Sequence, residues 1–164
     1  MSDNATSRFP NIGSADDEFS AATGSAVFVD RSSVGKLLVT GADGLDLLHR
    51  LSTNDLLDLK PFSARMTVFT TDKGRIVDYV RVLVLSDSLM LMTSPGQDNQ
   101  MKSWIDKYTI MENIQIKAVT LSWAMFSLVG PEAQVKAGDM LGHLPEFDSV
   151  VDLEFANTTI TVDC

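Results

Sequence analysis

The chain has 164 residues, of which 45% are hydrophobic and 21% charged, so it carries enough apolar material for a packed core and is not disordered throughout. Its net charge of −9 at pH 7 disfavours nucleic-acid binding, which needs many lysines and arginines to neutralise phosphates. No apolar stretch approaches the ~18 residues of a membrane span, and residues 1–24 lack the basic start and apolar run of a secretory signal. We therefore expect a cytoplasmic protein with neither a nucleic-acid partner nor a membrane partner.

The first 24 residues are acidic and rich in small polar residues, and they show no sustained apolar periodicity. Such a composition predicts a flexible acidic leader over residues 1–24 that contributes little to stability. We expect regular structure to begin near Ser25 and residues 25–164 to form a single domain.

The first part of that domain predicts two strands and a helix. Short β-rich runs at 26–29 and 36–40 indicate neighbouring strands. After a turn at 41–44, leucines spaced three and four residues apart predict a short helix that the side chain of Asp43 caps.

The clearest hairpin surrounds Asp72-Lys73-Gly74, because glycine supplies the positive φ that such a turn needs. Its strands are expected at 66–70 and 76–85. The segment 89–93 adds a third strand, so the three form an antiparallel meander.

The remaining elements alternate between helix and strand. Apolar residues spaced i, i+3, i+4 and i+7 predict an amphipathic helix over 97–108. Gly130-Pro131 ends a strand at 123–129 and begins a third helix that runs to about Leu141. Further strands are expected at 114–116, 150–155 and 159–162. The predicted fold class is α+β, with antiparallel strand meanders and three helices.

The sequence gives little indication of a metal site or of a catalytic nucleophile. Cys164 is the only cysteine and the chain has 2 histidines, so neither a disulfide nor a metal site is expected. The chain has no glycine-rich phosphate signature and no Gly-x-Ser-x-Gly elbow. Asp78 is of interest because it interrupts an apolar strand: either it meets solvent through simple alternation, or it faces a pocket and hydrogen-bonds a ligand amine.

Four stretches occur in the order typical of one family. They are a strand ending in an acid at 27–32, a strand and helix with a Thr-Asn-Asp run at 39–55, the hairpin at 70–78, and a Gly-Pro-x-Ala helix start at 128–133. Together they resemble the folate-binding fold of the aminomethyltransferase of the glycine cleavage system and of its paralogues in iron–sulfur cluster assembly. The resemblance implies that the chain binds a reduced folate, tetrahydrofolate, and no metal.

The resemblance also implies a ligand site at Met66, Asp78, Tyr79 and Ser94. The aminomethyltransferase is expected to carry two successive acids in the hairpin strand, and the second contacts the reactive pterin nitrogens. Here Asp78 retains the first acid, Tyr79 replaces the second, Met66 stands for an aromatic residue and Ser94 for an asparagine. No catalytic residue is therefore assigned. The net charge of +2 over residues 31–81 agrees with a ligand that has an anionic glutamate tail.

Members of the family continue with a second half of the folate domain and a C-terminal domain, so we expect residues 25–164 to be an incomplete domain. The Lys-Gly-Cys motif of the iron–sulfur branch is missing, since no cysteine precedes Cys164. Two functions stay open: a folate-binding protein without full transferase activity as this chain alone, or a non-catalytic interaction or assembly module that has lost the ligand site. Because an incomplete domain leaves apolar surface uncovered, we expect a homo-oligomer.

Overall fold

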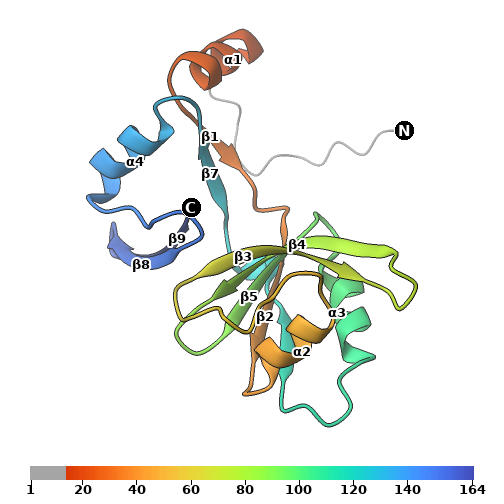
Figure 1. The fold of residues 1–164 in the computed structure, drawn as a ribbon. Coiled ribbons are helices and arrows are strands. Elements are labelled where there is room, and N and C mark those ends of the chain that lie inside the picture. Colours follow the sequence, from red (N-terminus) through yellow and green to blue (C-terminus); the bar gives the residue numbers. More distant parts are fainter. Residues whose placement is uncertain (1–13) are drawn as a thin grey trace. The chain divides into compact units, whose positions relative to one another are not determined.

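The computed structural model describes residues 14–164 (Figure 1). Within them the chain divides into two compact units, which are described separately below. The small unit comprises residues 14–31 and 125–143, and the large unit comprises residues 32–124 and 144–164. The prediction of a single domain over residues 25–164 stays a prediction. The first and seventh strands pair with each other and not with the main sheet.

The large unit is built on a five-stranded sheet in the order β3-β4-β5-β2-β6, in which all neighbours are antiparallel. Its strands are β2 (Gly35–Thr40), β3 (Ala64–Thr70), β4 (Ile76–Val84), β5 (Leu89–Thr93) and β6 (Gln115–Ala118). A separate hairpin joins β8 (Val150–Phe155) to β9 (Thr158–Asp163). The predicted α+β class with antiparallel meanders is confirmed, including the hairpin turn at Gly74, whose φ is 69°.

Two helices cover one face of this sheet: α2 (Gly44–Arg50) and α3 (Asp98–Asp106). A short 3₁₀ helix, Thr120–Ser122, follows β6. The main core lies between the helices and the sheet, where Leu47, Trp104 and Phe69 are buried together. A smaller cluster on the other face joins the start of β8 to the sheet through Val150, Ala64, Leu83 and Met90.

The prediction that the side chain of Asp43 caps α2 is wrong. Asp43 occupies the position before the helix, but its side chain makes no hydrogen bond to the helix N-terminus. Its carboxylate instead accepts a hydrogen bond of 2.7 Å from the backbone N–H of Asn113. Asp43 therefore ties the turn after β2 to the loop before β6, a contact between distant segments that local pattern does not reveal.

The small unit contains α1 (Ala15–Gly24), β1 (Val27–Asp30), β7 (Phe126–Val129) and α4 (Ala133–Leu141). β1 and β7 form an antiparallel ribbon in which Val27 lies opposite Val129. Glu132, just before α4, accepts a hydrogen bond of 2.8 Å from the hydroxyl of Ser25. The helix predicted after Gly130-Pro131 is confirmed, and it ends before Gly142 as expected.

Helix α1 corrects the expectation that regular structure begins near Ser25. Ser14 and Asp17 form a capping box, in which each side chain bonds the backbone N–H of the other residue. Acidic residues fill the first turn, where they interact favourably with the helix dipole. The helix has no buried residue, so it leaves no apolar periodicity in the sequence. Residues 1–13 of the predicted leader lie outside the described residues, and the flexibility of the leader stays a prediction.

None of the helices within residues 14–164 is long and apolar enough to cross a membrane.

Glu112 fastens the loop after α3 to α2. Its carboxylate accepts hydrogen bonds from the guanidinium of Arg50 (2.8 Å) and from the backbone N–H groups of Ile110 (2.8 Å) and Met111 (3.1 Å). These donors, the Arg50 guanidinium first, lower the pKa of Glu112 from its ordinary value of 4.5 to about 2. A carboxyl with a lowered pKa stabilises the folded state above its ordinary pKa, and this contribution is lost as the pH falls toward 2.

Replacing Glu112 with glutamine is therefore expected to flatten the decline of stability between pH 5 and pH 2. Urea unfolding of the wild type and Glu112→Gln at pH 6 and pH 3 measures the difference. Glu146→Gln, at an exposed carboxyl in another loop, is the control and should keep the wild-type pH dependence. An equally steep decline in Glu112→Gln would contradict the assignment.

Candidate functional site

Asp78 lies on the face of β4 that continues into the main core, and it is 7% exposed. Its Oδ1 accepts hydrogen bonds from the hydroxyl of Ser94 (2.6 Å) and the backbone N–H of Tyr79 (2.9 Å), and its Oδ2 accepts one from the backbone N–H of Ser94 (3.0 Å). The interpretation that alternation places Asp78 in solvent is wrong, because Val80 and Val82 on the same face are buried. The carboxylate joins β4 to the turn that follows β5.

Ser94 is therefore expected to matter for stability. Replacing Ser94 with alanine removes the 2.6 Å hydrogen bond to a buried carboxylate, and we expect the free energy of unfolding to fall by about 2 kcal/mol. Chemical denaturation measures the change. Ser103→Ala, at an exposed serine on α3 that bonds its own helix, should stay within about 0.5 kcal/mol of the wild type. Equal effects in the two variants would rule out a structural role for the Asp78–Ser94 pair.

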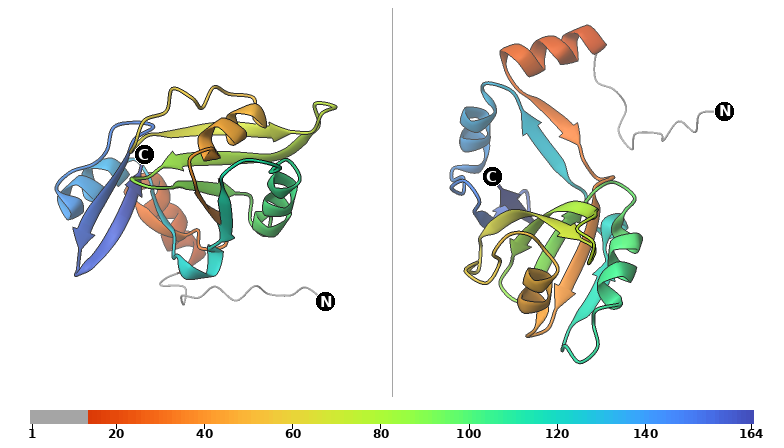
Figure 2. Two further views of the ribbon diagram at one scale, coloured as in Figure 1. Left: turned by 90° about the horizontal axis from the view of Figure 1, so that it is seen from below. Right: turned by 45° about the vertical axis from the view of Figure 1, so that its right-hand side comes forward.

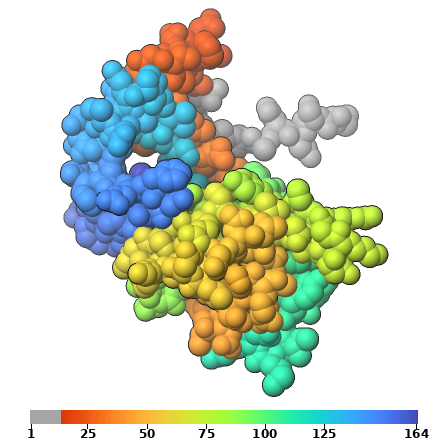
Figure 3. Space-filling model, in the orientation of Figure 1, coloured from red at the N-terminus to blue at the C-terminus, as the bar shows by residue number. Residues whose placement is uncertain are grey.

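Met66 and Tyr79 lie on the opposite face of the sheet from Asp78. In the β3–β4 register Val68 lies opposite Tyr79 and Met66 lies opposite Arg81, and side chains two residues apart on a strand share a face. We call these four residues (Met66, Val68, Tyr79 and Arg81) the Tyr79 face. Tyr79 is 57% exposed, and Met66 is half-buried. The tip of the hairpin that carries them projects from the large unit (Figure 3).

The structure thus divides the four predicted site residues into two pairs. Asp78 and Ser94 contact each other on the core side, and Met66 and Tyr79 are diagonal neighbours on the other side. One ligand on the Tyr79 face cannot reach the carboxylate of Asp78 through the sheet. The strand alternation expected from the sequence already separates Asp78 from its neighbour, but the hydrogen bonds to Ser94 are visible only in the folded chain.

Sequence reasoning missed Arg81, the one basic side chain in β4. Its guanidinium donates to both carboxylate oxygens of Asp163 (2.7 to 3.0 Å), to Asp148 (3.0 Å) and to the carbonyl oxygen of Cys164 (2.7 Å). Its side chain is 14% exposed. Burial by itself lowers the pKa of Arg81, but the hydrogen bonds and charges of Asp163 and Asp148 outweigh it and raise the pKa. The one signal in the sequence is an arginine within an apolar strand.

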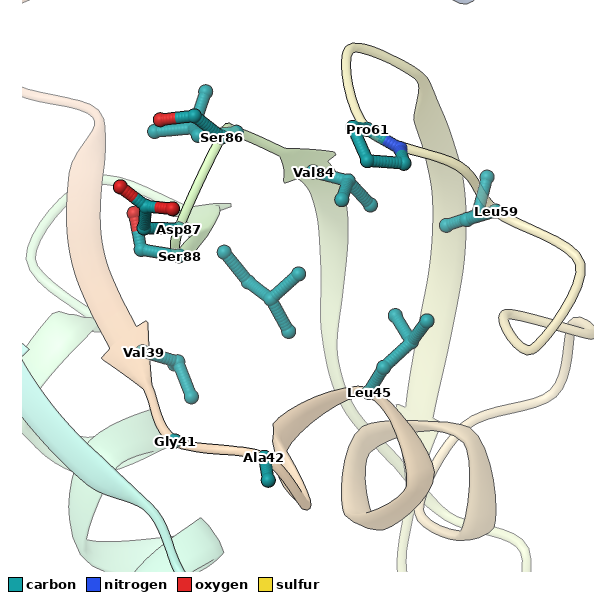
Figure 4. A pocket seen from close by; sticks show the side chains of 12 residues that line it. Val39, Gly41, Ala42, Leu45, Leu59, Pro61, Val84, Ser86, Asp87 and Ser88 are labelled. Atoms are coloured by element: carbon teal, nitrogen blue, oxygen red, sulfur yellow. The ribbon is translucent and has the colours of Figure 1, made fainter.

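A second candidate is a hollow of about 280 Å³ between the end of β2, the start of α2 and the β4–β5 turn (Figure 4). Leu45, Pro61 and Val84 are among its mostly apolar walls, and Asp87 is its one charged group. It includes none of the predicted site residues. A negative charge at its rim opposes an anionic ligand, so the hollow suits an apolar group and not a folate tail. Residues 14–164 contain no group of three or more His, Cys, Asp or Glu side chains placed to hold a metal ion.

The arrangement of strands and helices has a counterpart among solved structures. The glycine cleavage system aminomethyltransferase T from Bartonella henselae superposes with a TM-score of 0.70 at 21% sequence identity, over 82% of this chain and 37% of that one. The class defined by the fold is therefore an α+β domain of the aminomethyltransferase type. The chain belongs to the family described as the GCVT N-terminal domain, whose model matches residues 6–155. The family resemblance inferred from the four sequence stretches is confirmed.

Curated relatives agree with this assignment. The aminomethyltransferase of Halalkalibacterium halodurans is 30% identical over 119 residues, which are 72% of this chain and 32% of the relative. The aminomethyltransferase of Bacillus licheniformis is 27% identical over 128 residues, which are 77% of this chain and 35% of the relative. The chain spans about a third of the length of the relatives that it matches.

Proposed function

We propose that this chain binds a reduced folate, of the tetrahydrofolate class, on the Tyr79 face and that it does not transfer an aminomethyl group by itself. The observation that carries the proposal is the exposed Tyr79 beside the half-buried Met66 on one face of the family hairpin. An exposed phenol ring offers a flat surface on which a pterin stacks, and its hydroxyl can hydrogen-bond the ring nitrogens. A thioether next to the ring adds adaptable apolar contact.

The proposed absence of transfer follows from the same two positions. Transfer needs the one-carbon carrier held close to the attacking amine and an acidic group that handles charge at the pterin nitrogens. The hydroxyl of Tyr79 hydrogen-bonds but does not supply a carboxylate. Asp78 does not replace it, because its carboxylate faces the core and accepts three internal hydrogen bonds.

The test is calorimetric titration with tetrahydrofolate, together with an aminomethyl-transfer assay. We expect weak binding by the wild type, about tenfold weaker binding by Tyr79→Ala through the loss of stacking, and no turnover. Ile76→Ala is the matched control, because Ile76 is a 72% exposed residue of the same strand, and it should bind as the wild type does. Unchanged affinity in Tyr79→Ala would overturn the proposed site. Asp78→Ala should retain the wild-type affinity, because the carboxylate of Asp78 faces the core, and a loss of affinity in a folded Asp78→Ala variant would also contradict the site. Robust turnover by the wild type would refute the absence of transfer.

The alternative, an interaction or assembly module, has its own support in the small unit. None of the described residues of the small unit is buried, although Phe28, Phe126 and Val129 expose large apolar side chains. A two-stranded ribbon is marginal by itself, so we propose that a second copy of the chain covers it. Size-exclusion chromatography with light scattering tests this, and a strictly monomeric species at high micromolar concentration would contradict it. The cytoplasmic location stays a prediction.

A further inference from the structure

We propose that Arg81 is a carboxylate-binding residue of the Tyr79 face, and that Asp163 occupies it as an internal competitor of the ligand. The ligand class is a carboxylate, here the glutamate tail of a reduced folate. The inference in this form rests on the proposed function, and it assigns to Arg81 a binding role beyond the pterin contacts argued above.

The contacts of Arg81 are those of a built carboxylate site. A guanidinium presents its donors in a planar fork that matches the two oxygens of a carboxylate. Nε lies 3.0 and 2.8 Å from the two oxygens of Asp163, and Nη2 lies 2.7 Å from one of them. The side chain of Arg81 is largely buried, so its pairing is shielded from water and salt. A carboxylate from a ligand would find the same geometry if Asp163 moved away.

The position of Arg81 relates it to the proposed pterin contacts. It lies two residues after Tyr79 on β4 and directly opposite Met66 on β3. Two residues along a strand correspond to about 7 Å, a separation that a ligand with a ring at one end and an acid at the other can span. The Tyr79 face therefore combines an aromatic side chain, a thioether and a cation, which are the groups needed for a flat ring with an anionic tail.

The hairpin that carries Asp163 is held to the sheet mainly through β8. The backbone N–H of Ala64 donates to the backbone carbonyl of Asp148 (2.7 Å), just before β8, and that of Val150 donates to the carbonyl of Phe62 (2.9 Å). β9 pairs with β8 and reaches the sheet through the Arg81 contacts. Residues 154–159 at the far end of the hairpin are exposed, and the hairpin projects beyond the sheet (Figure 2). Asp163 lies at the end of the hairpin next to the sheet, opposite Val150. It can therefore release Arg81 by rotation of its side chain, while the pairing of β8 with β9 and the hydrogen bonds of β8 to the sheet are kept.

The charges around Arg81 explain why Asp163 would weaken the binding of an anionic ligand. Asp148 also contacts the guanidinium, at 3.0 Å, so two carboxylates neutralise one cation. A third carboxylate brought by a ligand meets net negative charge unless one of them leaves. Removing the charge of Asp163 should therefore strengthen the binding of an anionic ligand and leave a neutral one unaffected.

The experiment compares tetrahydrofolate with a tetrahydropterin that lacks the tail, by calorimetry on the full chain. Asp163→Asn is expected to bind tetrahydrofolate about tenfold more tightly than the wild type, which corresponds to one released charge-assisted contact. It is expected to bind the tetrahydropterin with the same affinity as the wild type. Adding Arg81→Gln to Asp163→Asn should abolish the gain. Asp152→Asn is the matched control, because Asp152 lies in the same hairpin and bonds the hydroxyl of Thr161. It should leave both affinities unchanged.

A second probe separates this inference from the proposed function. Glutarate, a dicarboxylate without a pterin, is titrated while the NMR signal of the Arg81 Nε–H group is followed. A saturable shift of this signal that Asp163→Asn reaches at a glutarate concentration about tenfold lower than the wild type supports the carboxylate site. This result would support the site even if no variant binds tetrahydrofolate and the folate proposal is wrong. Equal tetrahydrofolate affinity in the wild type and Asp163→Asn, with no glutarate shift, would overturn the inference and leave the folate proposal standing. If Asp163→Asn does not fold, Asp148→Asn should show the same gains at smaller size, and their absence there would also overturn the inference.

Discussion

Replacing Phe69 with alanine is expected to lower the free energy of unfolding by about 4 kcal/mol. Phe69 is fully buried between the sheet and α3, and its ring meets Trp104 edge to face at a centroid distance of 5.9 Å. Deleting the ring removes apolar burial, opens a cavity and breaks the aromatic pair, and each of these effects destabilises the core. Urea denaturation followed by tryptophan fluorescence measures the loss, since Trp104 reports directly on this contact.

The control for Phe69→Ala is Ile76→Ala, in the other strand of the same hairpin. Ile76 is 72% exposed, so its truncation removes little buried surface and should change stability by less than about 0.5 kcal/mol. A loss below about 1 kcal/mol in Phe69→Ala would mean that the helices do not pack on the sheet as described.

Replacing Gly41 with alanine should be the second most damaging change, at about 3 kcal/mol. Gly41 has a φ of 112°, and a Cβ at this position would lie 2.0 Å from the carbonyl oxygen of Asn113 and 2.8 Å from the Cα of Ile114. Both contacts are with backbone, which cannot rotate away as a side chain does. The substitution would therefore push the turn after β2 away from the segment that leads into β6. Thermal and urea unfolding quantify the loss.

Gly74→Ala separates the clash from the backbone strain. Gly74 has a φ of 69°, but nothing lies within 4 Å of its would-be Cβ. Alanine there pays only the cost of the left-handed conformation, about 1 kcal/mol. Equal losses in the two variants would show that the close approach of Asn113 to Gly41 does not contribute.

The two pairs of predicted site residues lie in different environments in this structure. Asp78 and Ser94 bond each other inside the protein, which is a structural role, whereas Tyr79 and Met66 present their side chains on a face that a ligand can approach. At position 79, where the family resemblance implies an acid, tyrosine offers an aromatic ring for stacking and no carboxylate. The calorimetric experiments proposed above examine these roles separately.

Local patterns in the sequence determined most of the secondary structure. The spacing of Met101, Trp104 and Ile105 placed α3, and the Asp72-Lys73-Gly74 turn placed the β3–β4 hairpin, because helix periodicity and turn chemistry depend on residues close together in the chain. The order of the four family stretches identified the fold as well. Helix α1 was not predicted, because a capping box stabilises it and it buries no apolar face that would give a periodic pattern.

Only the tertiary structure decided which side chains meet. Asp78 bonds Ser94, 16 residues away, and Arg81 bonds Asp163, 82 residues away. These pairs depend on strand register and on where the β8–β9 hairpin lies against the sheet, which are set by the packing of the whole unit. Alternation along β4 predicted that Asp78 and Tyr79 lie on opposite faces of the sheet. It could not show that Asp78 is hydrogen-bonded inside the protein, or that Tyr79 is exposed on the same face as an ion-paired arginine.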